Sequence, residues 1–259
     1  MKSLIYLSLA LALSIALISC ESDTVTNSNG ITSLDTSTFI YLFNIGNSWS
    51  YTYEIHASDI HPDSIIHYFS EYPLTLSVTL EILYDTIINS IQTRCFLQTI
   101  IDGQRTLRSR NYMINIDTAF SMYAHRGKGA FFPRDIPGKL TYNPDYITDE
   151  EIYIYNPPYT ILKYPVVTGR TWNINSSIVK KYEGHELIIN SAGTFNCMKT
   201  STVYSIMPES PYLDYFCKYG LLKRSVTFND ILITNEWFPE GMGTADLTHI
   251  LTVNSFNIR

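Results

Sequence analysis

Positive charge is scarce in this sequence, as is charge of either sign. Lysine and arginine number 18 against 24 aspartate and glutamate residues, which gives a formal net charge of -6 at pH 7. A surface that neutralises nucleic-acid phosphates needs an excess of cations, so this balance argues against a generic nucleic-acid-binding protein. We therefore expect no nucleic-acid partner.

Helical periodicity is also missing. Beyond the first twenty residues, no segment repeats apolar side chains every 3.6 residues over eleven or more positions. The composition favours strands instead, because the 20 tyrosines, with many isoleucines and threonines, fit half-buried pleated surfaces. A hydrophobic fraction of 45% excludes intrinsic disorder for most of the 259 residues. These features predict an all-β protein.

The apolar run near the N-terminus is too short to span a bilayer as a helix. It extends from Leu4 to Ile18, about fifteen residues against the roughly 20 required, and it follows Lys2 and precedes Ser19 and Cys20. This pattern predicts a secretory signal peptide over residues 1–19, cleaved between Ser19 and Cys20. The alternative is an ordinary signal in which Cys20 falls near the cleavage point by chance.

The end of this segment resembles the bacterial lipoprotein signal, in which the cysteine is diacylated and becomes the new N-terminus. The resemblance implies lipidation of Cys20 and a membrane anchor in the bacterial cell envelope, since two acyl chains suffice for stable anchoring. Residues 21–38 contain nine serines or threonines and few apolar residues, so residues 20–38 read as the lipidated cysteine and a flexible tether. The start at Cys20-Glu21-Ser22-Asp23 resembles surface-export signals of Bacteroidetes lipoproteins, which indicates the outer membrane but leaves its periplasmic and surface faces open.

Two segments that lie 123 residues apart share a pattern. Tyr41 to Trp49 and Tyr164 to Trp172 both place a tyrosine, a glycine, a hydroxyl residue and a tryptophan at equal spacing. An Ile-Ile-Asn-Ser motif recurs later, leading to Cys95 in one copy and to Cys197 in the other. We interpret this as a degenerate twofold repeat, with chance similarity as the alternative.

The repeat predicts how the chain is organised. Repeat 1 covers residues 39–125, a proline-rich connector covers 126–163, and repeat 2 covers 164–259, with His56 to Leu76 as an insertion in the first copy. The tryptophans are expected in the core, although a ligand groove lined by them is the alternative. Alternating apolar residues predict antiparallel strands that form a sandwich or an open curved barrel. The strand candidates are 49–55, 77–84, 93–101, 151–155, 193–206, 212–218, 221–228, 231–238 and 247–254.

The second half carries a further resemblance. The stretches Ala192 to Cys197 and Tyr215 to Arg224, with the Gly-x-(Ser/Thr)-Trp motif, resemble a group of uncharacterised lipoproteins from Bacteroidetes. Some of that group are similar in outline to the lipoprotein-carrier fold, an incomplete barrel closed by helices over an apolar cavity. This sequence predicts the strands but not those helices, a departure that argues against a carrier-type lipid cavity, and the resemblance supplies no catalytic residues.

Motifs for chemistry are incomplete. Gly46-Asn47-Ser48-Trp49-Ser50 lacks the second glycine of a nucleophile elbow, and His185-Glu186 lacks the second histidine of a zinc protease helix. We expect no enzyme activity, no catalytic residues and no cofactor. His56, His61 and His67, with Asp59 and Asp63, have suitable ligand chemistry for zinc, but their spacing matches neither a strand nor a helix face. A solvated loop is favoured over a metal site.

Basic residues gather in the middle of the chain. Eight lie between residues 94 and 139 against three aspartates, a local excess of five positive charges: Arg94, Arg105, Arg108, Arg110, Arg126, Lys128, Arg134 and Lys139. Such a cluster is suited to anionic lipid headgroups or sugars. The favoured alternative is an exposed strand face on which the charges discourage edge-to-edge pairing.

Three cysteines follow Cys20, which is an odd number for an oxidising compartment. Cys197 and Cys217 lie on consecutive strand candidates. Direct opposition would centre their hairpin on Met207, whereas the prolines suggest a centre nearer residue 210, so a bulge or an uneven loop has to absorb the difference. We predict a disulfide between Cys197 and Cys217, with Cys95 left as a buried free thiol.

These observations favour an exported, lipid-anchored protein with a non-enzymatic binding or structural role in the cell envelope. Its partner would be an envelope protein, a glycan or a lipid. The alternative is a carrier or chaperone for a lipid or hydrophobic ligand, which requires a continuous apolar cavity.

Substitution Cys20→Ala tests the anchor. Removing the thiol removes the acylation site, so incorporation of a fatty-acid analogue and membrane fractionation should both be lost. Labelling that continues unchanged in this variant would show that the cysteine is not the lipidated residue.

Overall fold

The computed structural model describes residues 39–103, 105–127, 151–234 and 240–259. The predicted signal peptide, with Ser19, Cys20 and the predicted tether, and residues 128–150 of the predicted connector lie outside the described residues. The described chain forms one 3-10 helix, η1 (Asp63–Phe69), and twelve strands. The strands are β1 (Ser48–His61), β2 (Leu74–Ile88), β3 (Ile91–Asp102), β4 (Arg105–Ile116), β5 (Ala119–Gly127), β6 (Ile152–Lys163), β7 (Thr171–Asn175), β8 (Ile178–Asn190), β9 (Gly193–Tyr204), β10 (Met207–Cys217), β11 (Gly220–Ile233) and β12 (Gly243–Asn257).

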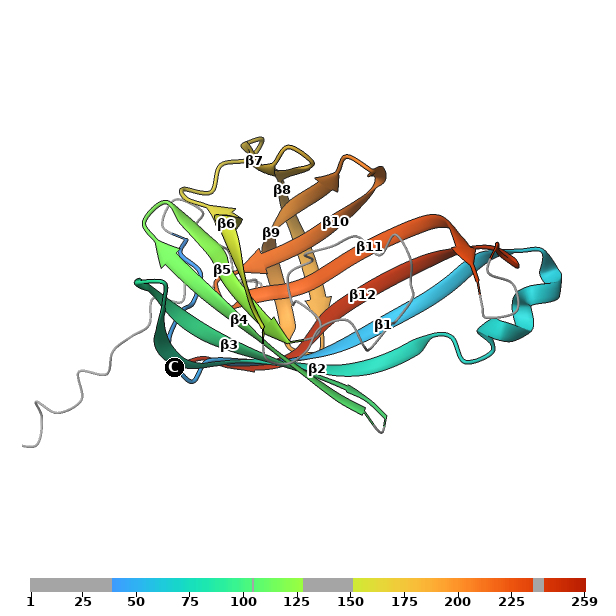
Figure 1. Cartoon of the computed structure of the whole chain (residues 1–259), viewed down its shortest axis with the longest axis horizontal. Coiled ribbons are helices and arrows are strands. Elements are labelled where there is room, and N and C mark those ends of the chain that lie inside the picture. Colours follow the sequence, from blue (N-terminus) through green and yellow to red (C-terminus); the bar gives the residue numbers. More distant parts are fainter. Residues whose placement is uncertain (1–38, 104, 128–150, 235–239) are drawn as a thin grey trace, which may run out of the picture.

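All twelve strands belong to one antiparallel sheet that curls into a nearly closed barrel (Figure 1). Each strand pairs with its neighbour in sequence from β1 to β6 and again from β7 to β12. The two halves are joined by the pairing of β1 with β12, and β6 and β7 form the two edges of the sheet. No described helix has the length and apolar character needed to cross a membrane.

The prediction of an all-β antiparallel fold is confirmed, and of its two forms the barrel is correct. Strands β4, β5, β7 and β8 were not among the strand candidates. In the first part of β4 the outward residues Arg108 and Arg110 are charged and the inward ones include Ser109 and Asn111, so hydrophobic alternation is absent there. Conversely, the candidates 221–228 and 231–238 are not separate: Gly220 to Ile233 is one strand with a register shift after Phe228.

Backbone hydrogen bonds repeat at the two Gly-x-x-Trp segments. Gly46 and Gly169 both have positive φ, +89° and +83°, which glycine adopts without strain. Gly46 N–H donates to Ile82 O at 2.8 Å, and Gly169 N–H donates to Tyr182 O at 2.7 Å. The same backbone turn therefore precedes β1 and β7, and it places Trp49 and Trp172 on the first strand of each half.

The strand registers show that Cys95 and Cys197 do not occupy equivalent positions in the two halves. Ile82 lies opposite Phe96, and its counterpart Tyr182 lies opposite Thr200; the shift that follows places Cys95 opposite Tyr84 but Lys199 opposite Gly184. Cys95 thus corresponds to Lys199 and not to Cys197, because the β8–β9 hairpin extends further beyond its shift than the β2–β3 hairpin does.

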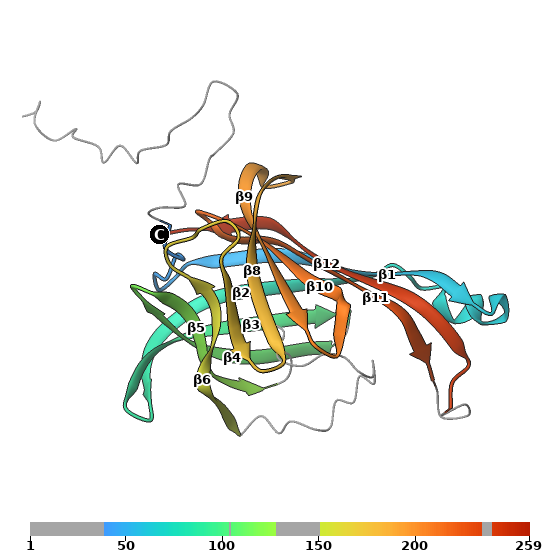
Figure 2. The ribbon, with the colours of Figure 1, turned by 90° about the horizontal axis from the view of Figure 1, so that it is seen from above.

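The predicted insertion is not a loop. Residues 56–61 continue β1 and residues 74–76 begin β2, with η1 between them. Together with the long strands β11 and β12 they form an extension that projects from the barrel (Figures 1 and 2). The extra residues of the first half therefore lengthen the sheet.

Both tryptophans lie in the core, with 1% and 4% of their surface exposed. Trp49 Nε1 donates to Tyr219 O at 2.5 Å, and Trp172 Nε1 donates to Thr160 O at 3.1 Å. Gly220 permits the first contact, since a Cβ there would lie 3.0 Å from Trp49 Nε1. Buried indoles need such a partner for the N–H group, so these residues pack the core and fix neighbouring backbone.

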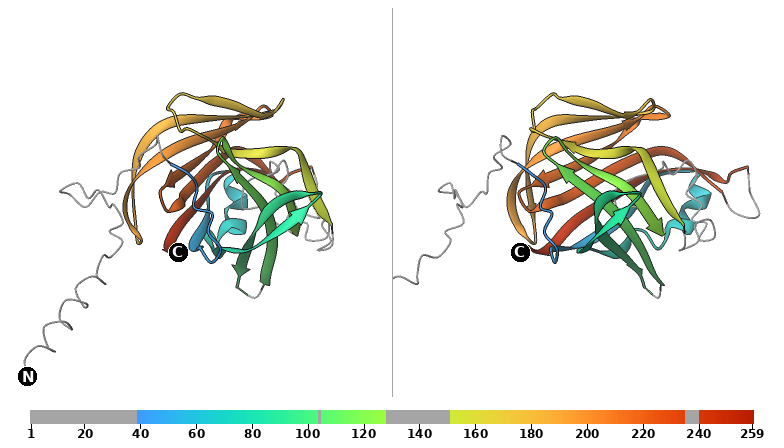
Figure 3. Two further views of the ribbon diagram at one scale, coloured as in Figure 1. Left: turned by 90° about the vertical axis from the view of Figure 1, so that its left-hand side faces the viewer. Right: turned by 60° about the vertical axis from the view of Figure 1, so that its left-hand side comes forward.

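The segment before β1 fills one end of the barrel with aromatic rings. Tyr41 is 1% exposed and stacks on Phe120 with ring centroids 4.2 Å apart. Its backbone N–H donates to the hydroxyl of Tyr164, the corresponding residue of the second half, at 2.9 Å. This segment, blue in Figure 3, is thereby bonded to the chain that leads into β7.

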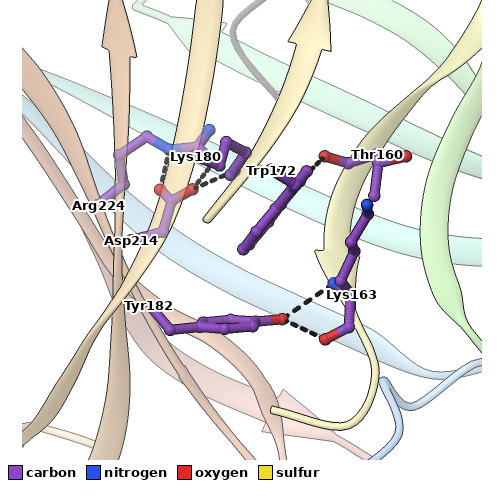
Figure 4. A network of polar contacts seen from close by, with 7 residues as sticks. All are labelled: Thr160, Lys163, Trp172, Lys180, Tyr182, Asp214 and Arg224. Atoms are coloured by element: carbon purple, nitrogen blue, oxygen red, sulfur yellow. Dashed lines mark hydrogen bonds and ion pairs between the residues drawn. The ribbon is translucent and has the colours of Figure 1, made fainter. Parts of the chain in front are cut away.

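Side chains join the two sheet edges, β6 and β7, where no strand pairing is present in the described sheet. The hydroxyl of Tyr182 donates to Lys163 O at 2.7 Å and accepts from Lys163 N–H at 2.9 Å. Together with the Trp172–Thr160 bond, this contact links β6 to β7 and β8 (Figure 4). We call this set of contacts the seam.

Substitution Tyr182→Phe should weaken the seam, because both backbone groups of Lys163 lose their partner. We expect unfolding free energy to fall by about 1–3 kcal/mol in urea denaturation, with faster hydrogen exchange at the Lys163 amide. Tyr68→Phe, at an exposed tyrosine of η1, is the matched control. Unchanged exchange at Lys163 would mean that the hydroxyl does not close the seam.

Candidate functional site: a buried charge cluster beneath an aromatic belt

Three charged side chains meet inside the barrel. Lys180 of β8, Asp214 of β10 and Arg224 of β11 are 2%, 1% and 8% exposed. The guanidinium of Arg224 binds Asp214 with two bonds, Nε to Oδ1 at 2.5 Å and a second nitrogen to Oδ2 at 3.0 Å. Lys180 Nζ lies 3.7 Å from Asp214 Oδ2 (Figure 4), beyond ordinary hydrogen-bond distance.

Strand pairing brings these residues together. Asp214 lies opposite Arg224 on one side and opposite Thr200 on the other. Lys180 lies opposite Thr202, which in turn lies opposite Tyr212. Directly opposite residues share a face of the sheet, so all of these side chains point to the barrel interior. We refer to Lys180, Asp214 and Arg224 as the charge cluster.

The charge cluster holds two cationic groups against one carboxylate. Burial lowers the pKa of Lys180 to about 8, although the neighbouring Asp214 opposes that shift. Burial also works to raise the pKa of Asp214, but Arg224 and Lys180 outweigh it and hold that pKa below its usual range. Counted over these three side chains alone, the cluster has two cations and one carboxylate in a buried setting, where charge is costly unless it is paired.

A ladder of aromatic rings lines the same interior face. Adjacent rings have centroids 5.7, 5.9, 5.4 and 5.8 Å apart as the ladder crosses strands β9, β10, β11, β12 and β1. Its members are Tyr204, Tyr212, Phe228, His249 and Tyr53. On the other side of the seam, Tyr155 and Tyr159 of β6 contact each other at 6.2 Å. We call these seven residues the aromatic belt.

The aromatic belt adjoins the charge cluster and carries polar groups. Tyr212 lies two residues before Asp214 on the same face, and burial raises its pKa to about 12. Burial lowers the pKa of His249 to about 4, so its imidazole is neutral at pH 7. Tyr53 Oη and His249 Nδ1 lie 2.5 Å apart. If the hydroxyl donates, the ring proton is on Nε2.

Several buried polar atoms have no protein hydrogen-bond partner within the described part of the chain. On the charged wall these are Thr200 Oγ1, Ser210 Oγ and His249 Nε2. On the wall formed by β4 and β5, the amide oxygen and nitrogen of Asn111 also have no hydrogen-bond partner among the described residues. Buried polar groups are nearly always satisfied in native proteins, so hydrogen-bonding capacity is concentrated in this interior.

The two walls occupy corresponding positions of the two halves. From Gly46 the register passes through Ile82, Phe96 and Asn111 to His125, and from Gly169 it passes through Tyr182, Thr200 and Asp214 to Arg224. Asn111 and His125 therefore correspond to Asp214 and Arg224. One half presents an ion pair to the interior, and the other presents an amide and an imidazole.

The residues singled out from the sequence lie elsewhere. His56 and His61 are on the end of β1 and His67 is in η1; His61 Nε2 lies 3.0 Å from Asp59 Oδ1. No group of three metal-ligating side chains occurs among the residues that the structure describes. Of the basic cluster, Arg94 binds Asp85, and Arg110 and Arg126 lie opposite each other on β4 and β5. Lys128, Arg134 and Lys139 lie outside the described residues.

Sequence reasoning missed the charge cluster, although a signal was present. Lys180 stands between Ile178 and Tyr182 on the apolar face of its strand, and Asp214 stands between Tyr212 and Phe216. A charged residue on the apolar face of an alternating strand is a candidate buried ion. Only the neighbouring strands reveal that such residues meet.

Comparisons with known proteins give two distantly similar crystal structures. A candidate exported protein with a YmcC-like fold from Bacteroides fragilis NCTC 9343 is 12% identical, with a TM-score of 0.32 over 85% of this chain and 99% of that one. A candidate lipoprotein from Parabacteroides distasonis ATCC 8503 is 10% identical, with a TM-score of 0.31 over 85% of this chain and 98% of that one. No family model and no curated protein matches the sequence.

The cysteines lie where a disulfide is feasible. Phe216 lies opposite Met198, so Cys217 and Cys197 are the next residues along the two strands. The turn between the strands lies at Ser205 and Ile206 instead of near residue 210, and a register shift follows between Met207 and Tyr212. A hydrogen bond with Cys217, followed by burial, raises the pKa of the Cys197 thiol. All three thiols are free in the structure, so the disulfide stays a prediction.

Refolding in a glutathione redox buffer should oxidise Cys197 and Cys217 and leave Cys95 reduced. The bond would stabilise the fold by about 3 kcal/mol in the chain-entropy model. Non-reducing peptide mapping checks the pairing, and Cys95→Ser should leave it intact. A bridge that includes Cys95, or three free thiols after oxidation, would contradict it.

Proposed function

We propose that this protein is a lipid-anchored component of the bacterial cell envelope that binds a small anionic ligand inside its barrel without transforming it. The observation that carries the proposal is the charge cluster, in which Lys180 and Arg224 share one carboxylate, Asp214. An anionic group placed beside Lys180 would balance the remaining charge.

The carboxylate of Asp214 holds the two cations of the cluster at different distances. Arg224 is held by Asp214 through two hydrogen bonds, which fixes its orientation. Lys180 is 3.7 Å from the same carboxylate, so its ammonium is less tightly engaged. A second acceptor at Lys180 would gain a charge-assisted hydrogen bond in a setting of low dielectric constant.

The side chains around the charge cluster favour a polar ligand over an acyl chain. Hydroxyls, an imidazole and an amide lie among the aromatic rings, and Tyr41 with Phe120 fills one end of the barrel. An acyl chain needs a continuous apolar lining, whereas these groups suit a polar ligand. The lipid anchor inferred from Cys20 would hold such a binding site at the membrane.

Anion binding can be measured by thermal unfolding and calorimetry with sodium acetate, sulfate and phosphate, each compared with sodium chloride at equal ionic strength. We expect at least one of these anions to raise the Tm of the wild-type protein. Lys180→Met should abolish that rise, while Lys181→Met, at the half-buried neighbour on the same strand, should retain it.

The variant should remain folded, because Lys180→Met leaves the balanced Arg224–Asp214 pair and removes the unbalanced charge. Circular dichroism checks this. Anion affinity should fall as pH rises through about 8, since Lys180 then loses its proton. An anion response that survives Lys180→Met, or that does not change across this pH range, contradicts the proposed site.

A further inference from the structure

We propose that one end of the barrel docks on the surface of an anionic lipid bilayer. We call this end the entry rim, because the described chain begins there at Phe39 and leads into β1. The proposal goes beyond the ligand site inside the barrel. It rests on the lipid anchor of the proposed function, and it names the face that the anchored barrel turns to the membrane.

Antiparallel pairing decides which turns belong to the entry rim. Every described strand pair is antiparallel, so successive turns alternate between the two ends of the barrel. The turns β2–β3, β4–β5, β8–β9 and β10–β11 therefore lie where β1 and β7 begin and β12 ends. The residues before β1 (blue) and the C-terminus lie on the left of Figure 1, and η1 lies on the right, at the opposite end.

Side-chain bonds support this placement of the two longest hairpins of the rim. Arg94, near the start of β3, donates to the carbonyl oxygen of Phe43 in the segment before β1. The hydroxyl of Ser191, in the β8–β9 turn, donates to Asn254 O at 3.4 Å, near the end of β12. Both hairpins are thus bonded to chain that reaches the entry rim.

Each half exposes an isoleucine at the tip of a hairpin on this rim. Ile87 lies two residues before the β2–β3 turn, and Ile189 lies two residues before the β8–β9 turn. Both side chains are 72% exposed, and both belong to the Ile-Ile-Asn-Ser motif that recurs in the two halves. Turns favour small and polar residues, so a large apolar side chain at the same place in both halves indicates a partner outside the chain.

Other segments of the entry rim also expose large apolar side chains: Ile40, Ile45, Ile91, Ile116, Val167 and Leu187. Binding to a bilayer interface increases with buried apolar area and with attraction to anionic lipids, so it requires no groove or cavity. Apolar exposure alone does not select this end, because Ile206 at the opposite end is 71% exposed. The charge of the two ends and the position of the anchor select it.

The two ends of the barrel differ in the charge of their surface. The comparison covers exposed or partly exposed side chains of the described residues, in the turns or within three residues of them. Cations prevail at the entry rim, where Lys163, Arg170, Lys218 and Arg259 stand against Asp117. Acids prevail at the opposite end, where Arg126 stands against Asp59, Asp63, Glu71, Glu151, Glu209 and Glu240. An anionic lipid surface attracts the first end and repels the second.

The predicted anchor lies on the same side as the cations. The predicted tether leads from Cys20 to Phe39, and a flexible chain of this length has a root-mean-square reach of roughly 25 Å. Acylation of Cys20 would therefore keep the entry rim within reach of the bilayer. Ile87 and Ile189 can then enter the headgroup region while the surrounding cations contact lipid phosphates.

Co-sedimentation with vesicles tests the entry rim. The mature chain from residue 20 is used with Cys20→Ala, so that neither the signal peptide nor an acyl chain contributes to binding. The vesicles contain phosphatidylcholine and phosphatidylglycerol in equal parts, or phosphatidylcholine alone. We expect this unacylated chain to bind the mixed vesicles more tightly than phosphatidylcholine, and added salt to weaken that binding.

The double substitution Ile87→Ser with Ile189→Ser should lower the partition coefficient on mixed vesicles about ten-fold, because two apolar side chains no longer enter the interface. Ile206→Ser is the matched control, since it removes an equally exposed isoleucine from the opposite end. Arg259→Gln should lower the coefficient about five-fold on mixed vesicles and leave phosphatidylcholine binding unchanged. Arg108→Gln, at an exposed arginine nearer the opposite end, should change neither.

Three results would overturn the entry rim: an unacylated chain that binds neither vesicle, a double variant that binds like its parent, or an equal loss in Ile206→Ser. A change of oligomeric state in the double variant, seen by light scattering without a change in vesicle binding, would overturn it in favour of a second copy of the chain. The proposed function fails separately. Lys180→Met should bind vesicles like its parent, so neither a missing anion response nor missing acylation of Cys20 in cells alters this measurement.

Discussion

The pairing of β1 with β12 is the contact on which the rest of the structure depends. Every other strand pair joins neighbours in sequence, and such a meander alone would remain an open ribbon. Joining the first strand to the last brings Tyr53 beside His249 and Trp49 beside Gly220. The interior is created by this long-range closure, whose cost in chain entropy is repaid by the aromatic core.

Closure at the opposite side is made by side chains. β6 is the last strand of the first half, as β12 is of the second, and β7 is the first strand of the second half, as β1 is of the first. The unpaired edges β6 and β7 are therefore the counterparts of the paired strands β12 and β1. There the hydroxyl of Tyr182 and the indole of Trp172 take the place of a strand ladder. The prolines of β6, Pro157 and Pro158, cannot donate to such a ladder, which gives a physical reason for the difference.

The charge cluster is costly for folding, and its position links the repeat to the proposed ligand. Asp214 and Arg224 correspond to Asn111 and His125, so both halves place polar groups at the same level of the barrel. A packed apolar interior would be expected to be more stable than one with a buried lysine. The two halves thus differ in charge at this level of the barrel, which a symmetric barrel would not.

Much of the architecture was determined by the sequence alone. Alternation of apolar and polar residues predicted antiparallel strands, and the Gly-x-x-Trp segments indicated the turns that the structure places before β1 and β7. Local patterns fix such features because turn geometry and strand alternation depend on neighbouring residues. Counting residues between Cys197 and Cys217 predicted an irregularity, but the turn lies at Ser205 and Ile206 and not near residue 210, and the prolines lie within β10. Only the tertiary structure decided which strands close the barrel, that β11 is one strand, and that Lys180, Asp214 and Arg224 meet. Those outcomes depend on the register between strands, because a shift of one residue moves every side chain of a strand to the other face of the sheet. The residues of one strand do not reveal its register with the next.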